Sequence, residues 1–345
     1  MSSNLTAEAS HLVRLFIILA PGLLAAVYFY VHGNGSSNNE TLSVSKKISE
    51  LDVVRQFLWK YGRYRVLERS ICMDDATTCF DVRDNVGRTK NGRLYLYRSI
   101  FRDSFELTVM NLMIPENPNM RTLNTSKWQP DKTATNLNCY TPLMIEEMFV
   151  SGAVKMDREV NSQILSIGLG AGYINSYLRS MYPKMNITVV EIESKMVNIA
   201  QKWFSLVLDD LHRVIVMDGI EFLRKAAMEE RRFDVIHIDA CTHAAKKPVE
   251  SFVRCPVPGF FTPESVGNIF KILNKRGAVV MNLLSIGLPK EVVAETVLHN
   301  FKKVFKHCVV RDAEDSPPNM VATCSQNERL GNLKEEYDRF LRIAF

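Results

Sequence analysis

The chain has 345 residues, of which 46% are hydrophobic and 23% are charged, and its formal net charge is +5. These values are ordinary for a globular protein with one large domain or two modest ones. The basic residues occur mostly as scattered pairs among acids rather than on one basic face, so we expect no nucleic-acid partner.

The N-terminal region contains an uncharged apolar segment, LFIILAPGLLAAVYFYV, at residues 15–31. A bilayer crossing takes about 20 apolar residues, and a signal-peptide core has about 7–15. We therefore predict a single-pass membrane anchor over residues 1–33, in preference to a cleaved signal peptide or a buried core helix. Arg14 on the N-terminal flank favours a cytosolic N-terminus and a large domain that is lumenal or extracellular. This predicts a location in the endomembrane system.

Sequons and cysteines bear on that topology. Four N-x-S/T sequons follow the predicted anchor, at Asn34, Asn39, Asn124 and Asn186. Seven cysteines are scattered without a CxxC pair, so no metal site is predicted. Cys72 and Cys79 have a spacing that a disulfide could bridge in a lumenal domain, whereas free thiols in a cytosolic protein are the alternative.

The region before residue 136 divides into two parts. Residues 34–60 form a linker with an amphipathic helical pattern at residues 46–59. Residues 61–135 are β-rich, with four strand-like runs and turn signals between residues 61 and 114. We expect a small antiparallel β region there.

Strand-like and helix-like runs alternate from residue 136 to residue 325. The predicted strands lie at residues 162–169, 186–193, 212–219, 232–240, 277–284, 307–312 and 319–325. This alternation predicts an α/β fold with a doubly wound, Rossmann-like, mostly parallel sheet and helices on both faces. Residues 326–345 are expected to add a C-terminal helix.

The first strand of this region leads into a glycine turn formed by Gly168, Gly170 and Gly172. A dinucleotide fingerprint, G-x-G-x-x-G, would need a further glycine at the position of Tyr173. The turn therefore disfavours a nicotinamide or flavin dinucleotide but still suits another nucleotide.

Acidic residues follow the next strands. Glu191 ends the second strand, 23 residues after Gly168, and can accept hydrogen bonds from ribose hydroxyls. Asp218 follows the third strand, and Asp239 follows the fourth beside the expected reaction site. Each acid alone is typical of an ordinary strand-end cap. Together they suit a cationic nucleoside without phosphates, which S-adenosyl-L-methionine is.

The runs ILSIGLGAG, VVEIE, VMDGIEFL and FDVIHIDA resemble class I S-adenosylmethionine-dependent methyltransferases of the spermidine-synthase-like branch. They are most similar to the C-terminal half of elongation-factor methyltransferases of the methyltransferase-like thirteen type. The resemblance implies that Gly168, Gly170 and Gly172 lie along the methionine moiety, Glu191 on the ribose, and Asp218 with Gly219 near the adenine. It also implies that a homodimer is possible.

Departures from that family bear on the acceptor. Ser166 replaces the acid that usually opens the first motif, and Thr242 stands where aminopropyltransferases carry a second aspartate. Aminopropyl transfer is therefore disfavoured.

Methyl transfer to an amine needs fewer catalytic groups, because the amine has only to be neutral and correctly placed. Asp239 is the catalytic candidate, and His243 is a second one. Tyr140 and Tyr173 are expected at the mouth of the substrate pocket. The leading interpretation is methyl transfer to an amine of a protein or small molecule. The alternatives are an inactive nucleoside-binding scaffold and an aminopropyltransferase.

Overall fold

The computed structural model describes residues 48–344, except 74–77, 103–104, 135–138 and 243–252. The predicted membrane anchor, the sequons at Asn34 and Asn39, and the catalytic candidate His243 lie outside these residues. Among the helices that are described, none has both the length and the apolar character that a bilayer crossing requires.

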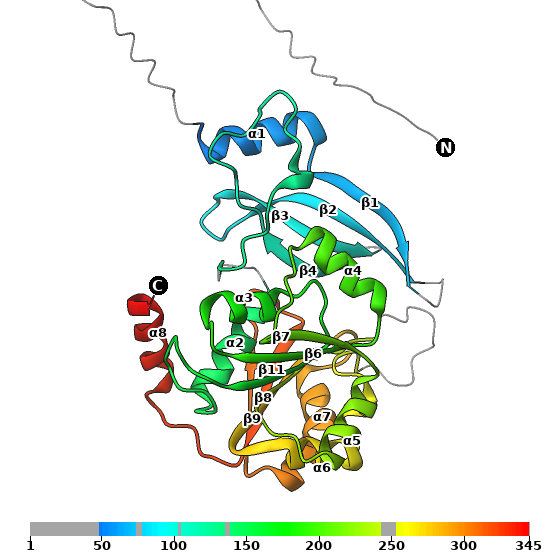
Figure 1. The fold of residues 1–345 in the computed structure, drawn as a ribbon, viewed down its shortest axis with the longest axis vertical. Coiled ribbons are helices and arrows are strands. Elements are labelled where there is room, and N and C mark those ends of the chain that lie inside the picture. Colours follow the sequence, from blue (N-terminus) through cyan, green and yellow to red (C-terminus); the bar gives the residue numbers. More distant parts are fainter. Residues whose placement is uncertain (1–47, 74–77, 103–104, 135–138, 243–252, 345) are drawn as a thin grey trace, which may run out of the picture. The chain divides into compact units, whose positions relative to one another are not determined.

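The first part of the chain folds as a helix followed by an antiparallel sheet (Figure 1). Helix α1 (Glu50–Tyr61) begins where the Ser49 side chain accepts a hydrogen bond from the backbone of Asp52. The four strands pair in chain order, as the turn-rich sequence predicts. They are β1 (Tyr64–Cys72), β2 (Cys79–Arg88), β3 (Leu94–Arg102) and β4 (Phe105–Asn111).

A buried arginine, paired with an aspartate of the same sheet, connects this sheet to later parts of the chain. Arg98 on β3 is 2% exposed and donates to the Asp84 carboxylate at 2.7 and 3.1 Å. The same guanidinium donates to the backbone carbonyl of Trp203, at the end of α4 (Ser194–Trp203), at 2.8 Å. A backbone carbonyl after β4, that of Thr125 in the 3₁₀ helix Thr125–Lys127, accepts a further bond at 2.8 Å. Arg98 therefore joins three separate segments.

The second sheet has seven strands in the order β10-β11-β9-β8-β5-β6-β7. They are β5 (Gln163–Ile167), β6 (Asn186–Glu191), β7 (His212–Val216), β8 (Phe233–Ile238), β9 (Leu273–Leu284), β10 (His307–Asp312) and β11 (Asn319–Ser325). The pairs β5–β6, β5–β8, β6–β7 and β8–β9 are parallel. The sheet is mixed rather than uniformly parallel, because β11 returns from β10 and pairs antiparallel with both β10 and β9.

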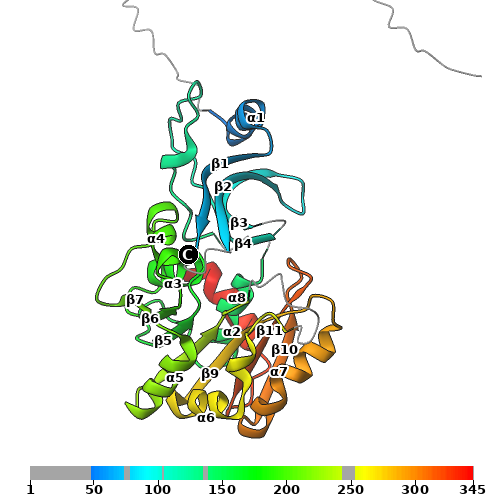
Figure 2. The ribbon, with the colours of Figure 1, turned by 90° about the vertical axis from the view of Figure 1, so that its right-hand side faces the viewer.

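Helices cover both faces of the seven-stranded sheet (Figure 2). Helices α2 (Thr141–Val150), α3 (Tyr173–Met181), α4 and α8 (Leu333–Ala344) pack into one core. Helices α5 (Gly219–Met228), α6 (Pro263–Ile272) and α7 (Lys290–Val304) pack into the other, with the 3₁₀ helix Pro258–Phe261. Both faces of β5 and β6 are thus buried, which is why their sequences are nearly continuous apolar runs. Each fully buried Val or Ile there stabilises the fold by roughly 1.5–3 kcal/mol.

Three disulfides use six of the seven cysteines, as Cys72–Cys79, Cys241–Cys255 and Cys308–Cys324. The first joins directly paired residues of β1 and β2, and the third joins directly paired residues of β10 and β11. The sequence left the Cys72–Cys79 bond open and did not indicate the other two. Cys139 is the free cysteine of the described residues.

Candidate active site

The glycine turn after β5 is packed so closely that side chains would not fit. Gly168 has a φ of 94°, and a Cβ there would lie 2.5 Å from the carbonyl oxygen of Asp239. Gly170 has a φ of 53°, and a Cβ there would lie 2.7 Å from Oγ1 of Thr108 on β4. Both the left-handed conformation and the close contacts therefore require glycine. The turn lies against the end of β8 and against the four-stranded sheet.

The third glycine begins a helix. Gly172, with a φ of 80°, is the N-cap residue of α3. Tyr173, the next residue, is 3% exposed and donates a hydrogen bond from its hydroxyl to the carbonyl of Ala134 at 2.5 Å. The side chain assigned by sequence to the pocket mouth is thus in the core, with its hydroxyl bonded to the segment before α2.

Glu191 connects the end of β6 to the glycine turn. Its two carboxylate oxygens accept hydrogen bonds from the backbone N–H groups of Leu169 and Glu193, each at 2.9 Å. Burial raises the pKa of the Glu191 carboxyl above its ordinary value, and backbone donors, those of Glu193 and Leu169 first, oppose that rise. Each oxygen keeps a lone pair with which to accept a ligand hydroxyl. The bond to Leu169 was not predicted from the sequence.

Asp218 serves as the N-cap of α5. Its Oδ1 accepts hydrogen bonds from the backbone of Ile220 at 2.7 Å and of Glu221 at 3.2 Å. A cap of this kind stabilises a helix by about 1 kcal/mol. Gly219 follows in close contact with the sheet, since a Cβ there would lie 2.6 Å from Cγ2 of Ile167. The capping role is therefore observed, and contact with an adenine stays a prediction.

Asp239, directly after β8, is the centre of a polar network. The Tyr140 hydroxyl donates to both carboxylate oxygens, at 3.0 and 2.9 Å. The Asn282 amide donates to Oδ1 at 2.8 Å. Burial raises the pKa of Asp239 to about 6, although both donors favour the charged form. Burial also raises the pKa of Tyr140 well above its usual value, so this hydroxyl stays neutral and acts as a donor.

Asn282 was missed by sequence reasoning. It lies on β9, is 1% exposed, and accepts a hydrogen bond from the Asn319 amide on β11 at 2.8 Å. The sequence did contain a signal for Asn282, because it is a polar residue inside the apolar run AVVMNLL. A buried amide needs hydrogen-bond partners, so such a position indicates a polar contact inside the fold. The two asparagines fix the direction from which Asp239 receives its amide donor.

The segment after Asp239 is covalently held. Cys241, bonded to Cys255, has its Sγ 3.8 Å from Oδ1 of Asp239 and 3.8 Å from the Asn282 amide nitrogen. Thr242 donates its backbone N–H to the carbonyl of Arg254 at 2.9 Å.

His237, within β8, is fully buried, and this burial lowers its pKa to about 4. It is therefore a packing residue at neutral pH.

Comparison with known proteins identifies the domain. Residues 143–312 match the spermine/spermidine synthase domain. The chain is 27% identical over 179 residues to the eEF1A lysine and N-terminal methyltransferase homolog of Drosophila melanogaster, a match that covers 52% of this chain and 25% of that protein. The chain thus spans about a quarter of the length of this relative.

Two solved structures share the fold. The human methyltransferase-like protein 13 in complex with SAH has a TM-score of 0.52 and 24% identity, covering 59% of this chain and 92% of that one. A probable spermidine synthase from Corynebacterium glutamicum has a TM-score of 0.50 and 16% identity, covering 81% and 85%. Residues 143–312 therefore match a spermine/spermidine synthase domain, and the chain shares its fold with these two structures.

Proposed function

We propose that this chain is an S-adenosylmethionine-dependent methyltransferase that acts on an amine of a protein or small molecule. The observation that carries the proposal is the Asp239 carboxylate, which accepts hydrogen bonds from Tyr140 and Asn282 in a residue whose backbone carbonyl lies against Gly168. The relatives named for methylation of eEF1A lysine and N-terminal groups, both amines, support it.

The residues around the turn fit the cofactor. Gly168 and Gly170 let the turn pack closely against Asp239 and Thr108, and the Glu191 carboxylate accepts a hydrogen bond from the same turn. S-adenosylmethionine, when bound, supplies a methyl group on a positively charged sulfur. Glu191 would hold its ribose, and the carboxylates of Glu191 and Asp239 would favour its positive charge.

Asp239 is suited to prepare the acceptor. An ammonium must lose a proton before its nitrogen can attack, and a carboxylate at hydrogen-bond distance can accept that proton and orient the amine. With a pKa of about 6, the Asp239 carboxyl is mostly ionised at neutral pH yet basic enough to accept a proton. Tyr140 and Asn282 keep it in one orientation.

Replacing Glu191 by alanine should weaken S-adenosylmethionine binding at least about tenfold, because hydrogen bonds to a charged group contribute roughly 1.5–3 kcal/mol. Calorimetric titration of the full chain measures this, with Glu221→Ala on exposed α5 surface as the matched control. Decarboxylated S-adenosylmethionine and NAD are titrated in parallel. Tighter binding of the decarboxylated form would favour aminopropyl transfer, and no binding of any ligand would favour the inactive scaffold.

We propose further that the domain is lumenal or extracellular and is tethered by residues 1–33. Disulfides persist in oxidising compartments and are rare in the cytosol. Three of them in one domain support this topology, together with the apolar N-terminal segment. Of the described sequons, Asn124 is exposed, whereas Asn186 begins β6 and binds the Arg213 guanidinium at 2.5 Å.

Mass spectrometry of the non-reduced protein from its native membrane should therefore find three disulfide-linked peptide pairs. A glycan is expected at Asn124 and not at Asn186, because a strand residue committed to the sheet is not available to the transferase. Alkylation before reduction should modify Cys139 alone. Labelling of all seven cysteines without reduction would contradict the proposed topology.

A further inference from the structure

Basic side chains gather at one edge of the seven-stranded sheet. Helices α5, α6 and α7 all end there, and β8, β9 and β10 begin there (Figures 1 and 2). The Arg232 guanidinium, just before β8, donates to the backbone carbonyl of Lys271 at 2.6 Å. The rings of Phe270 and Phe305 meet edge to face, with their centroids 5.7 Å apart, and bring the ends of α6 and α7 together. Residues 224–234, 271–276 and 302–306 therefore form one surface, the basic edge.

The basic edge carries more positive charge than the chain as a whole. Its 22 residues include ten Lys or Arg and three acids, a formal balance of +7, whereas the full chain has a net charge of +5. The rest of the chain therefore has a formal balance of −2. In the sequence these basic residues occur in separate pairs and singly, and it is the fold that brings them to one place.

Three side chains of the basic edge are not explained by ordinary local pairing. Lys275, Arg276 and Lys306 are exposed, and among the residues that the structure describes none of them has a carboxylate within ion-pair distance. Basic residues in the last turn of a helix are common because they complement its dipole. These three lie outside the helices, so the dipole does not account for them. Like charges that gather in this way repel one another, and such a surface suits a ligand of opposite charge.

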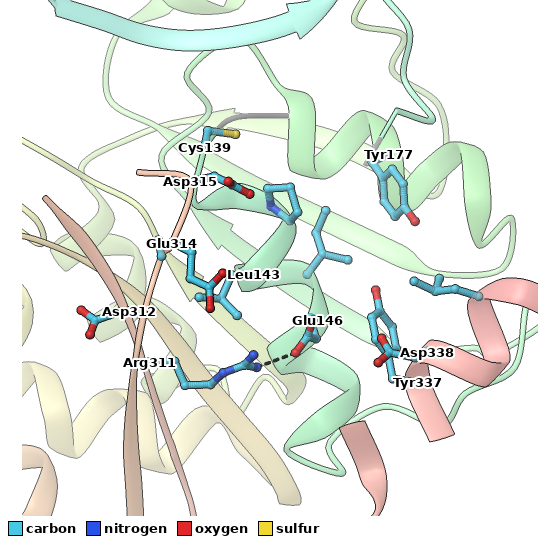
Figure 3. A pocket seen from close by; sticks show the side chains of 14 residues that line it. Cys139, Leu143, Glu146, Tyr177, Arg311, Asp312, Glu314, Asp315, Tyr337 and Asp338 are labelled. Atoms are coloured by element: carbon cyan, nitrogen blue, oxygen red, sulfur yellow. Dashed lines mark hydrogen bonds and ion pairs between the residues drawn. The ribbon is translucent and has the colours of Figure 1, made fainter. Parts of the chain in front are cut away.

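Acidic side chains of the same layer lie too far away to neutralise the basic edge. Asp312 and Asp315 line a cavity between α2 and the segment after β10 (Figure 3). Asp312 ends β10, whereas Lys306 precedes its first residue. Six residues of extended strand span about 20 Å, and physiological salt screens exposed charges beyond about 8 Å. The basic edge is also remote from Gly168 and Asp239, which follow the carboxyl ends of their strands.

The arrangement of the charges indicates an extended polyanion. They lie on three helix ends and three strand starts, so a ligand with one anionic group would meet only a few of them. Six of the ten basic residues are lysines, and a lysine is a point charge on a flexible stem. Such side chains suit a row of repeated sulfates or phosphates.

Two observations favour sulfates over the phosphates of a nucleic acid. Phe233 and Phe305, the aromatic residues of the basic edge, are 3% and 4% exposed, so neither ring is available to stack on a base. The three disulfides support a lumenal or extracellular domain, and the polyanions of that compartment are sulfated polysaccharides rather than nucleic acids.

We propose that the basic edge binds a sulfated polysaccharide, at a surface separate from the cofactor site. The choice of polysaccharide rests on the proposed lumenal or extracellular location, whereas attraction of a polyanion depends only on the basic edge. Contacts between its Lys and Arg side chains and the sulfates release counterions, as phosphate contacts do in nucleic-acid binding.

The test measures binding of a fluorescein-labelled heparin dodecasaccharide to the full chain in detergent, by fluorescence anisotropy. We expect saturable binding that weakens about a hundredfold between about 50 and 200 mM salt, because about four counterions are released. The variant Lys275→Gln/Arg276→Gln/Lys306→Gln should bind at least about tenfold more weakly, since each lost contact removes the release of about one counterion.

The matched control removes three exposed basic side chains elsewhere and changes the net charge equally. It is Arg121→Gln/Lys127→Gln/Lys155→Gln. This control should bind heparin as the wild type does. S-adenosylmethionine is titrated into the same samples and should bind both variants and the wild type alike, because the basic edge is separate from the cofactor site.

Competition identifies the class of polyanion. Unlabelled heparin should displace the labelled sugar at a lower concentration than duplex DNA, polyglutamate or desulfated heparin. Displacement at a lower concentration by DNA or polyglutamate would overturn the assignment to a polysaccharide. Equal affinity of the wild type and the basic-edge variant, or no saturable binding, would overturn the inference even where disulfide mapping supports the proposed topology.

Discussion

Replacing Asp239 by asparagine should lower turnover about a hundredfold or more and weaken S-adenosylmethionine binding far less. A positioned base typically contributes a factor of about 10²–10⁴ to the rate. Asparagine keeps the shape of the side chain and can still accept from Tyr140 and Asn282, but it cannot take a proton. Methyl transfer from labelled cofactor to an amine acceptor measures the rate, and calorimetry measures binding.

The pH dependence separates a base from a merely structural aspartate. The pKa of Asp239 is raised to about 6, so the carboxylate is lost as the pH falls through that value, and kcat/KM should fall with it. Asn282→Ala removes a donor that favours the charged form, which should move this acid limb to higher pH. The pKa of this carboxyl is higher in the folded state than in the unfolded state, so the charged form of Asp239 destabilises the fold at neutral pH. Asp239→Asn removes that charge and should therefore not reduce stability near neutral pH. An unchanged acid limb in Asp239→Asn would contradict the assignment.

Replacing Arg98 by leucine should lower the free energy of unfolding by about 3–5 kcal/mol, which is a large part of the stability of a typical domain. The substitution leaves the fully buried Asp84 carboxylate without its partner and frees the carbonyls of Trp203 and Thr125. Urea unfolding followed by circular dichroism measures the change.

The double variant Arg98→Leu/Asp84→Leu is the control for this result. Removing both charges of a buried pair is commonly far less costly than removing one. We therefore expect the double variant to recover part of the lost stability. Arg83→Leu, which breaks the more exposed pair with Asp81, should have a much smaller effect. An Arg98→Leu protein as stable as the wild type would show that the pair contributes little.

The site residues that lie directly after a single strand were predictable from sequence. Gly168 and Gly170 stand where the backbone must turn against the sheet, and Glu191 and Asp239 follow apolar runs that could only be buried strands. Local pattern alone therefore located the turn and two carboxylates. It could not show that Glu191 is bonded to the turn, because that contact joins residues 22 positions apart.

The parts that depend on tertiary pairing were not predictable. Asn282 and Asn319 meet only because β11 lies antiparallel beside β9, and the same hairpin supplies the antiparallel part of a sheet that was predicted to be mostly parallel. The Cys241–Cys255 bond likewise joins segments that meet only in the folded chain. Asp218 shows the opposite case, in which a predicted ligand contact coincides with an ordinary helix cap.

The contacts between the two sheets bear on how this chain can be divided. The sequence suggests a boundary near residue 136, but β4 contributes Thr108 to the glycine turn, with a bond from Ala171 at 3.2 Å, and Lys202 of α4 binds Glu68 of β1 at 2.9 Å. Residues 47–345 accordingly cluster as one compact unit. A fragment that starts after the boundary would retain every residue of the predicted cofactor site and yet lose the wall against which its glycine turn is shaped. The part of the chain that must fold together is thus larger than the segment that carries the motifs.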